Sequence, residues 1–338
     1  MLLPYVHRVS SGEHLSPEDA RAAMLAILEG ESTTAQIAAF LVALRMKGEQ
    51  PQELLGFARA MREKSARVHL DLDSEPLLDT CGTGGDGSGT FNISTIAALV
   101  VAGAGVRVAK HGNRSLAGSC GSADLLEEFG VKLLTSPETA ARAIRQVGIG
   151  FMFAPAFHPA MKHAQPARTE LKMRTVFNLL GPLVNPARPT HQLIGAPSLE
   201  TAGLLAQALS QLGSEGALIV HGSDGLDEVT TTGCTEVFEV AHGRVRRFAW
   251  QPSDFGVEPS RPEDLAGGNL AENRRIAESI LHGERGPRRD IVLVNAAAAL
   301  VAAGVAENLA QAMRRAAESL DSGAARQKLH ALAQVSGR

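Results

Sequence analysis

Cysteine and aromatic residues are scarce in this chain of 338 residues. Its three cysteines, Cys81, Cys120 and Cys234, lie far apart and form no CxxC pair, which excludes a disulfide framework and a cysteine-based zinc site. Because aromatic residues make up only 4% of the chain, the core must be built from Ala, Leu, Val and Ile. The length exceeds the usual limit for one hydrophobic core, so we expect two domains.

A strong excess of charge of one sign is also missing, since the formal net charge is −3. This balance argues against a general nucleic-acid-binding or membrane-binding surface, and we expect neither partner. The longest apolar run, residues 96–106, is too short to span a bilayer. The first residues carry neither the apolar stretch of a secretion signal nor a lipidation motif, so we expect a cytoplasmic protein.

Helix signals dominate the first 65 residues, where capping patterns and apolar stripes predict three helices. From residue 75 onwards, apolar strands alternate with helices. The expected strands are 76–80, 106–112, 193–197, 217–222 and 290–296. The expected helices are 94–105, 122–130, 200–213, 272–283 and an alanine-rich C-terminal stretch.

This alternation predicts an α/β fold in which a small helical domain accompanies a larger domain with a mostly parallel central sheet flanked by helices. A cation-rich helical segment interrupts the alternation after Pro159 and could return to the N-terminal bundle. We therefore assign residues 1–70 with about 160–182 to the helical domain, and residues 71–159 with 183–338 to the α/β domain.

Five glycines between Gly82 and Gly89 separate the strand at 76–80 from the helix that follows. They include a GxGxxG pattern, but the next strand ends in Lys110 to Arg114 rather than in the acidic residue that a dinucleotide site requires. A Walker loop is excluded because no Gly-Lys-Ser/Thr occurs there. If the loop is more than a plain connection, its exposed backbone amides at a helix N-terminus suit an anion.

Polar side chains follow the glycine loop and the next strand. Asn92, Ser94 and Thr95 either meet a phosphate or merely cap the helix. Lys110 and Arg114 either neutralise phosphate charge or lie in a solvated turn. The carboxyl ends of parallel strands share one edge of a sheet, so a ligand at that edge would meet both groups.

Two adjacent carboxylates, Asp227 and Glu228, follow the strand at 217–222. Their side chains suit Mg²⁺ bound together with substrate phosphate oxygens, and the Ser94 hydroxyl could complete the shell. The alternative is an acidic surface loop. Arg168 lies in a cation-rich stretch, where one arginine could pair with a substrate carboxylate.

The motifs GTGGD, NIST, KHGNR, GSADLLEEFG, HPAMKH, RTVFNLLGPLVNPA and DGLDE occur in this order. In this arrangement the chain resembles the anthranilate phosphoribosyltransferases, and the resemblance spans nearly its whole length. It implies the class III phosphoribosyltransferase fold, which is similar to that of pyrimidine nucleoside phosphorylases, and a homodimer formed through the helical domain. It also implies Mg²⁺-dependent transfer of phosphoribosyl from 5-phosphoribosyl 1-pyrophosphate to the amine of anthranilate. This reaction is the second step from chorismate to tryptophan.

The resemblance also implies roles for single residues. Those expected to bind phosphoribosyl pyrophosphate are Gly82, Gly85, Asp86, Thr90, Asn92, Ser94, Thr95, Lys110, His111, Gly112, Asn113, Arg114 and Ser122. Those expected to contact anthranilate are Gly82, Asn113 and Arg168. Ser94, Asp227 and Glu228 are expected to hold Mg²⁺, with two ions per subunit.

The loop after KHGNR departs from the family pattern. Ala117 and Gly118 replace two usual hydroxyls, and Ser119 stands where a lysine is common. Each missing hydrogen bond weakens phosphate binding by about 1 kcal/mol. Two alternatives share the scaffold: a nucleoside phosphorylase, which has no need of the acidic pair, and a non-catalytic nucleic-acid-binding relative, which the negative net charge disfavours.

Overall fold

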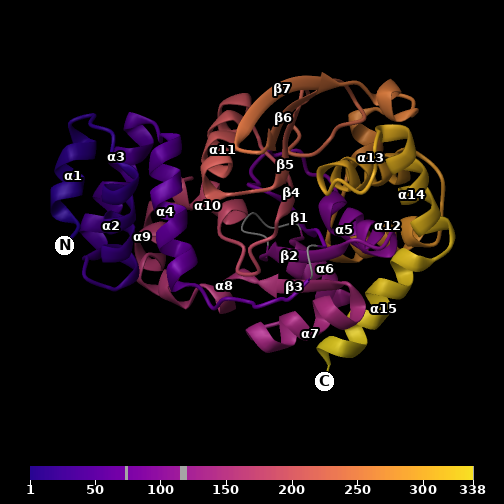
Figure 1. Ribbon diagram of the computed structural model, residues 1–338, viewed down its shortest axis with the longest axis horizontal. Coiled ribbons are helices and arrows are strands. Elements are labelled where there is room, and N and C mark those ends of the chain that lie inside the picture. Colours follow the sequence, from indigo (N-terminus) through magenta and orange to yellow (C-terminus); the bar gives the residue numbers. More distant parts are fainter. Residues whose placement is uncertain (73–74, 115–119, 338) are drawn as a thin grey trace.

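The computed structural model describes residues 1–72, 75–114 and 120–337. Its N-terminal part is a bundle of four helices, seen at the left of Figure 1: α1 (Leu3–Ser10), α2 (Pro17–Leu28), α3 (Thr34–Lys47) and α4 (Pro51–Lys64). The predicted caps are confirmed for α2 and α3, where the side chains of Ser16 and Thr33 accept hydrogen bonds from the backbone three residues later. Helix α1 was not predicted.

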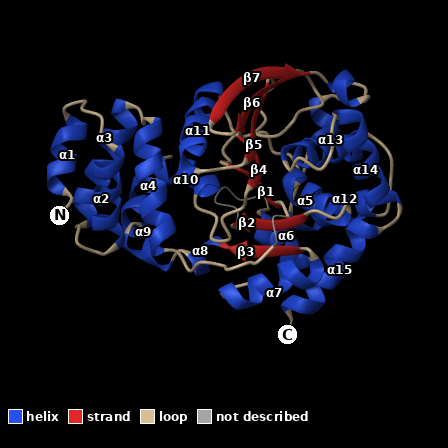
Figure 2. Ribbon diagram, viewed as in Figure 1, coloured by secondary structure: helices blue, strands red, loops and turns tan. Residues whose placement is uncertain are grey.

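A seven-stranded sheet forms the centre of the larger domain (Figure 2). Its strands are β1 (Leu77–Gly82), β2 (Arg107–Gly112), β3 (Ile149–Phe153), β4 (His191–Gly195), β5 (Gly216–Gly222), β6 (Thr235–Ala241) and β7 (Arg244–Trp250). The order across the sheet is β3-β2-β1-β4-β5-β6-β7. The first five are parallel, whereas β6 and β7 are antiparallel to their neighbours. The predicted mostly parallel sheet is therefore confirmed.

Helices cover both faces of this sheet. Beyond the bundle they are α5 (Ile93–Gly103), α6 (Ser122–Glu128), α7 (Pro137–Val147), α8 (Ala154–Phe157), α9 (Gln165–Leu171), α10 (Val176–Leu180), α11 (Leu199–Leu212), α12 (Leu270–Leu281), α13 (Pro287–Ala302), α14 (Leu309–Asp321) and α15 (Ala324–Ser336). Helices α5 and α13 pack on each other and on the central strands, and α11 packs on β5 and β6 from the opposite side (Figure 1). None of the helices in the described ranges has the length and apolarity needed to cross a membrane.

The prediction of a strand at 290–296 is wrong, because these residues lie inside α13. Periodicity cannot separate a short buried strand from a helix that is buried on all sides. Here four alanines follow Asn295 and Pro287 opens the helix, and both features favour a helix. Every residue of α13 from Ile291 to Leu300 is buried, which explains the lack of an amphipathic pattern.

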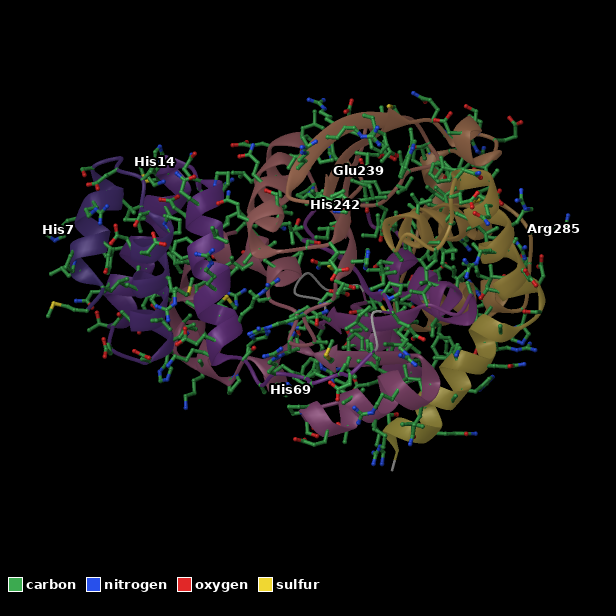
Figure 3. All side chains as sticks on the ribbon, in the orientation of Figure 1. His7, His14, His69, Glu239, His242 and Arg285 are labelled. Carbon is green, nitrogen blue, oxygen red and sulfur yellow. The ribbon has the colours of Figure 1, made fainter. Side chains whose placement is uncertain are left out.

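Strands β6 and β7 form a hairpin that the sequence did not reveal. His242 and Gly243 connect them with φ values of 50° and 72°, as a tight hairpin turn requires. His242 lies at this turn (Figure 3). The hairpin extends the sheet beyond β5, and the loop carrying Asp227 and Glu228 runs between β5 and β6.

The segment after β3 leaves the sheet and reaches the helical bundle. A 3₁₀ turn at Pro159–His163 packs on α2, α9 packs on α3, and α10 packs on α4. Helix α4 in turn packs on α11. As a result, a single set of buried apolar side chains runs from the bundle to Ile194 and Ile219 on one face of the sheet. The opposite face has its own, larger core around α5 and α13.

Candidate active site

The glycine loop after β1 and the acidic loop after β5 meet at the carboxyl edge of the sheet. The backbone N–H of Gly84 donates to Oδ2 of Asp227 at 2.9 Å. The N–H of Ser94, in the first turn of α5, donates to Oε1 of Glu228 at 3.1 Å. The two motifs therefore share one cleft, as the order of strands in a parallel sheet predicted.

This approach depends on two glycines. A Cβ on Gly82, at the end of β1, would lie 2.5 Å from Oδ2 of Asp227. A Cβ on Gly195, at the end of β4, would lie 1.5 Å from the backbone oxygen of Asp227. Neither strand end can carry a side chain while the acidic loop keeps this position.

The pKa values of both carboxyl groups in the acidic pair, Asp227 and Glu228, are raised. Burial, and to a lesser extent the neighbouring Asp86 carboxylate, raise the pKa of Asp227 to about 7 against smaller opposing effects of the Gly84 N–H and Arg174. Burial and the charge of Asp227 likewise raise the pKa of Glu228. Buried carboxylates that repel one another near neutral pH form a site that a divalent cation would stabilise.

The oxygen atoms of Asp227, Glu228 and Ser94 form an incomplete ligand set of the kind that Mg²⁺ accepts. Within the described ranges, no three His, Cys, Asp or Glu side chains cluster so that they could hold a metal by themselves. Asp227, Glu228 and the Ser94 hydroxyl supply oxygen ligands only. Mg²⁺ typically takes one or two carboxylates and completes its shell with water and substrate phosphate oxygens, so this incomplete set suits it.

Lys110 brings a positive charge to the same place. Its ammonium donates to the carbonyl of Thr80 at 2.5 Å and lies 3.5 Å from Oγ of Ser94. Burial lowers the pKa of Lys110, and the buried Asp79 carboxylate opposes that effect. Asp79 accepts from the backbone N–H of His111 at 3.3 Å and from Nδ2 of Asn185 at 2.8 Å, so a hydrogen-bonded counter-charge holds the strand end in place.

Two cavities adjoin at the ends of β1 and β2, one of about 240 Å³ and one of about 590 Å³. The smaller is lined by Cys81, Gly82, Gly84, Asn92, Ser94, Thr95, Lys110, His111, Gly112, Asn113, Ser122, Asp227 and Glu228. Five of these, Cys81, Gly82, His111, Gly112 and Asn113, also line the larger cavity. Ligands in the two cavities would therefore come together over the ends of these strands.

The larger cavity extends towards the helical bundle and contains Arg168. The guanidinium of Arg168 lies over the ring of Phe177 at 5.2 Å, and burial lowers its pKa. No ion pair joins Arg168 to a carboxylate of the residues whose positions the structure gives, so its charge is available to an anionic ligand.

Two histidines also line this cavity. Burial lowers the pKa of His111 to about 3 and that of His158 to about 4. Both rings are therefore neutral at physiological pH, and their centroids lie 5.2 Å apart. The site offers uncharged imidazoles beside one charged guanidinium.

Some predicted residues lie outside the lining of both cavities. They are Gly85, Asp86, Thr90 and Arg114. The guanidinium of Arg114 is turned to α6, where it pairs with Asp124 at 2.8 Å and with Glu127 at 2.5 Å. Ala117, Gly118 and Ser119, where the sequence departs from the family pattern, lie outside the described residues.

The sequence did not assign roles to three further residues at this site. Arg174 donates from Nη2 to the carbonyl of Thr83 at 3.3 Å and packs so closely on Gly85 that a Cβ there would lie 1.5 Å from Nη1. Asn185 holds Asp79, and Asn295 contacts the acidic loop from α13. The only signal in the sequence was that Asn185 and Arg174 fall within the RTVFNLLGPLVNPA motif region.

The fold and the site define a glycosyl transferase with a helical bundle and an α/β domain. A family model described as the glycosyl transferase family, a/b domain, matches residues 74–326. A second, described as the helical bundle domain of that family, matches residues 3–65.

Comparison with individual relatives shows which family of glycosyl transferases the chain resembles. An anthranilate phosphoribosyltransferase of Solibacter usitatus is 61% identical over 98% of both chains. The crystal structure of the Thermus thermophilus anthranilate phosphoribosyltransferase is 43% identical, covers 99% of each chain and has a TM-score of 0.93. That of Saccharomyces cerevisiae, in complex with PRPP (phosphoribosyl pyrophosphate) and Mg, is 31% identical over 99% of this chain and 98% of the other, with a TM-score of 0.91. The yeast enzyme has also been solved with 4-fluoroanthranilate, at 30% identity over the same shares and a TM-score of 0.88. The chain belongs to the anthranilate phosphoribosyltransferase family.

Proposed function

We propose that the protein transfers the phosphoribosyl group of phosphoribosyl pyrophosphate to the amine of anthranilate and releases pyrophosphate, in the tryptophan branch after chorismate. The observation that carries this proposal is the shared wall of the two cavities at Gly82, His111, Gly112 and Asn113. A phosphorylated donor in the polar cavity and an aromatic acid in the larger one would bring their reacting atoms together there. The yeast relative solved with PRPP and Mg, and with 4-fluoroanthranilate, supports both ligands.

The donor, phosphoribosyl pyrophosphate, would be bound by backbone amides of the glycine loop, by the N-terminus of α5 and by the Lys110 ammonium. We assign to it Gly82, Gly85, Asp86, Thr90, Asn92, Ser94, Thr95, Lys110, His111, Gly112, Asn113, Arg114 and Ser122. Nine of these line the smaller cavity, which supports the assignment. For Arg114 the assignment requires that its guanidinium leave Asp124 and Glu127 when the donor binds.

Magnesium would be held by Ser94, Asp227 and Glu228, and we propose two ions per subunit. When bound, Mg²⁺ supplies charge stabilisation for the departing pyrophosphate. The glycine loop and α5 contribute the N–H groups that orient the two carboxylates, through Gly84 and Ser94. Because the protein ligands alone are too few, we expect the metal to bind tightly only together with the pyrophosphate group.

Anthranilate would occupy the larger cavity, in contact with Gly82, Asn113 and Arg168. The guanidinium of Arg168 would pair with the carboxylate of the acid. The aromatic amine is a neutral nucleophile, so no strong base is required, and the neutral His111 and His158 suit an uncharged ring. Catalysis would then rest on positioning and on electrostatic stabilisation by the chain.

We also propose the domain division 1–70 with about 160–182 and 71–159 with 183–338, which the packing of α9 on α3 and α10 on α4 supports. We also propose a homodimer formed through the helical domain. Three free cysteines fit a reducing, cytoplasmic compartment.

Loss of anthranilate fluorescence tests the function directly. The purified protein should consume anthranilate when phosphoribosyl pyrophosphate and Mg²⁺ are both present, and should stop when either is omitted. A parallel assay with pyrimidine nucleosides and inorganic phosphate should give no free base. Nucleoside cleavage without anthranilate consumption would identify a nucleoside phosphorylase instead.

A further inference from the structure

Asn295 lies in the middle of α13, in the run of residues that the sequence suggested to be a strand. Its side chain is fully buried. Oδ1 accepts from the backbone N–H of Val229 at 2.8 Å, and Nδ2 donates to the Val229 carbonyl at 2.9 Å and to the Ile291 carbonyl at 2.9 Å. The amide thus pairs with both polar groups of one loop residue, as a neighbouring strand would, and its remaining N–H is satisfied within the helix.

Val229 directly follows Glu228, so this pairing fixes the backbone next to the acidic pair. Asp224 holds the residue before the acidic pair by accepting from the Leu226 N–H at 3.1 Å, and it also accepts from the hydroxyl of Thr230, next to Val229, at 2.7 Å. The two acidic residues therefore lie between two hydrogen-bonded points of the loop. Their carboxylates also accept hydrogen bonds from N–H groups of the glycine loop and α5, which lie outside the acidic loop.

We propose that Asn295 is a positioning residue that holds Asp227 and Glu228 in the arrangement that binds a divalent cation with pyrophosphate. This inference rests on the metal assignment in the proposed function. Only asparagine fits the task at this distance, because it presents one acceptor and two donors on a short stem. Alanine would leave the buried N–H and carbonyl of Val229 without partners, and the loop would have to shift to satisfy them.

Asn295→Ala and the milder Asn295→Ser test the proposal, with Ser319→Ala as control. The control removes a buried side-chain hydrogen bond of 2.7 Å from Ser319 on α14 to the Val100 carbonyl in α5, away from the acidic loop. Mn²⁺ binding in the presence of pyrophosphate is measured by electron paramagnetic resonance. The Mg²⁺ concentration for half-maximal rate and the KM for anthranilate are measured in parallel.

We expect Asn295→Ala to weaken Mn²⁺ binding by about tenfold, the effect of one unsatisfied buried group, and to raise the half-activating Mg²⁺ concentration similarly. Asn295→Ser should show a smaller change in the same direction, and it carries the test if the alanine variant does not fold. The KM for anthranilate at saturating Mg²⁺ should stay within about twofold, and Ser319→Ala should change neither metal quantity.

Two results would overturn the role of Asn295. One is unchanged Mn²⁺ binding in folded variants, and the other is an equal loss in Ser319→Ala, which would indicate general destabilisation. A variant with both Asp227→Asn and Glu228→Gln distinguishes a wrong role for Asn295 from a wrong assignment of the metal ligands. If that variant binds Mn²⁺ as the unaltered protein does, the metal site itself lies elsewhere.

Discussion

The smaller cavity takes its lining from a few short motifs, whereas the larger cavity collects side chains scattered between Met61 and Val184. Charge explains the difference. The phosphorylated donor proposed for the smaller cavity requires many amides, cations and carboxylates within a small space, and these groups lie at the ends of β1, β2 and β5. The aromatic acid proposed for the larger cavity requires apolar walls and one guanidinium, which side chains from several helices would provide. Polar binding sites therefore leave a sharper sequence signal than apolar ones.

The largest expected effect comes from neutralising the acidic pair in the polar cavity. Asp227→Asn with Glu228→Gln should lower turnover by at least about a thousandfold, because several kcal/mol of charge stabilisation by the cation is lost. The fold should remain, since the change removes repulsion between buried carboxylates. Steady-state rates and circular dichroism measure the two effects.

A matched control for this variant lies on the sheet hairpin. Glu236 and Glu239 on β6 pair with surface arginines and line neither cavity, and their double replacement by glutamine removes the same charge outside the site. Its turnover should stay within about twofold, because exposed pairs contribute little. An active Asp227, Glu228 variant would contradict the metal role of the polar cavity.

The elements that form the smaller, polar cavity were predicted well from the sequence. Strands β1, β2, β4 and β5 and helix α5 were all expected, and the meeting of the GTGGD and DGLDE motifs followed from their places after parallel strands. These inferences needed only local patterns and the rule that strand ends share an edge. The identity of Gly82, in contrast, has a tertiary cause, because Asp227 from the distant acidic loop occupies the space of a Cβ.

Interactions across long stretches of sequence could not be predicted in the same way. Asn295 looked like part of a buried strand, and nothing in its neighbourhood indicates that its partner is Val229, 66 residues earlier. The sequence did not distinguish Arg174 from the neighbouring cations, whereas the structure shows that it packs on Gly85. Arg114, expected at the phosphates, pairs in this structure with two carboxylates of α6, and its role in donor binding stays a prediction. Such choices depend on tertiary packing, which overrides local pattern.

A smaller and more selective effect is expected in the larger cavity. Arg168→Ala should raise the KM for anthranilate by about tenfold or more, since a charge-assisted hydrogen bond contributes about 1.5–3 kcal/mol. The KM for phosphoribosyl pyrophosphate should change less than about twofold. Arg168→Lys should restore part of the loss, because lysine keeps the charge but not the bidentate geometry. Arg145→Ala, on the exposed side of α7, is the control. Equal changes in both KM values would contradict the division between the cavities.

The smallest effect is the dependence of protein stability on pH that the buried carboxyl of Asp227 in the polar cavity causes. In the metal-free protein, Asp227 has a pKa of about 7 against an ordinary value of 3.8, so the folded chain holds a proton that the unfolded chain has lost. Its contribution to stability is fully present at low pH and is lost as pH rises through 7. Between pH 6 and pH 8 this carboxyl should lower the free energy of unfolding by about 1 kcal/mol.

Thermal melting at these two pH values, compared between the unaltered protein and Asp227→Asn, measures that contribution together with the part of the Glu228 pKa shift that the charge of Asp227 causes. The fall in melting temperature should be smaller in the variant by a few degrees or less. Mg²⁺ with pyrophosphate should reduce the fall in the unaltered protein, since the cation binds the ionised carboxylate and its affinity rises with pH. If Asp227→Asn melts with the same pH dependence as the unaltered protein, the carboxyl is already ionised below pH 6, and the cleft between the glycine loop and the acidic loop carries less repulsion than its burial indicates.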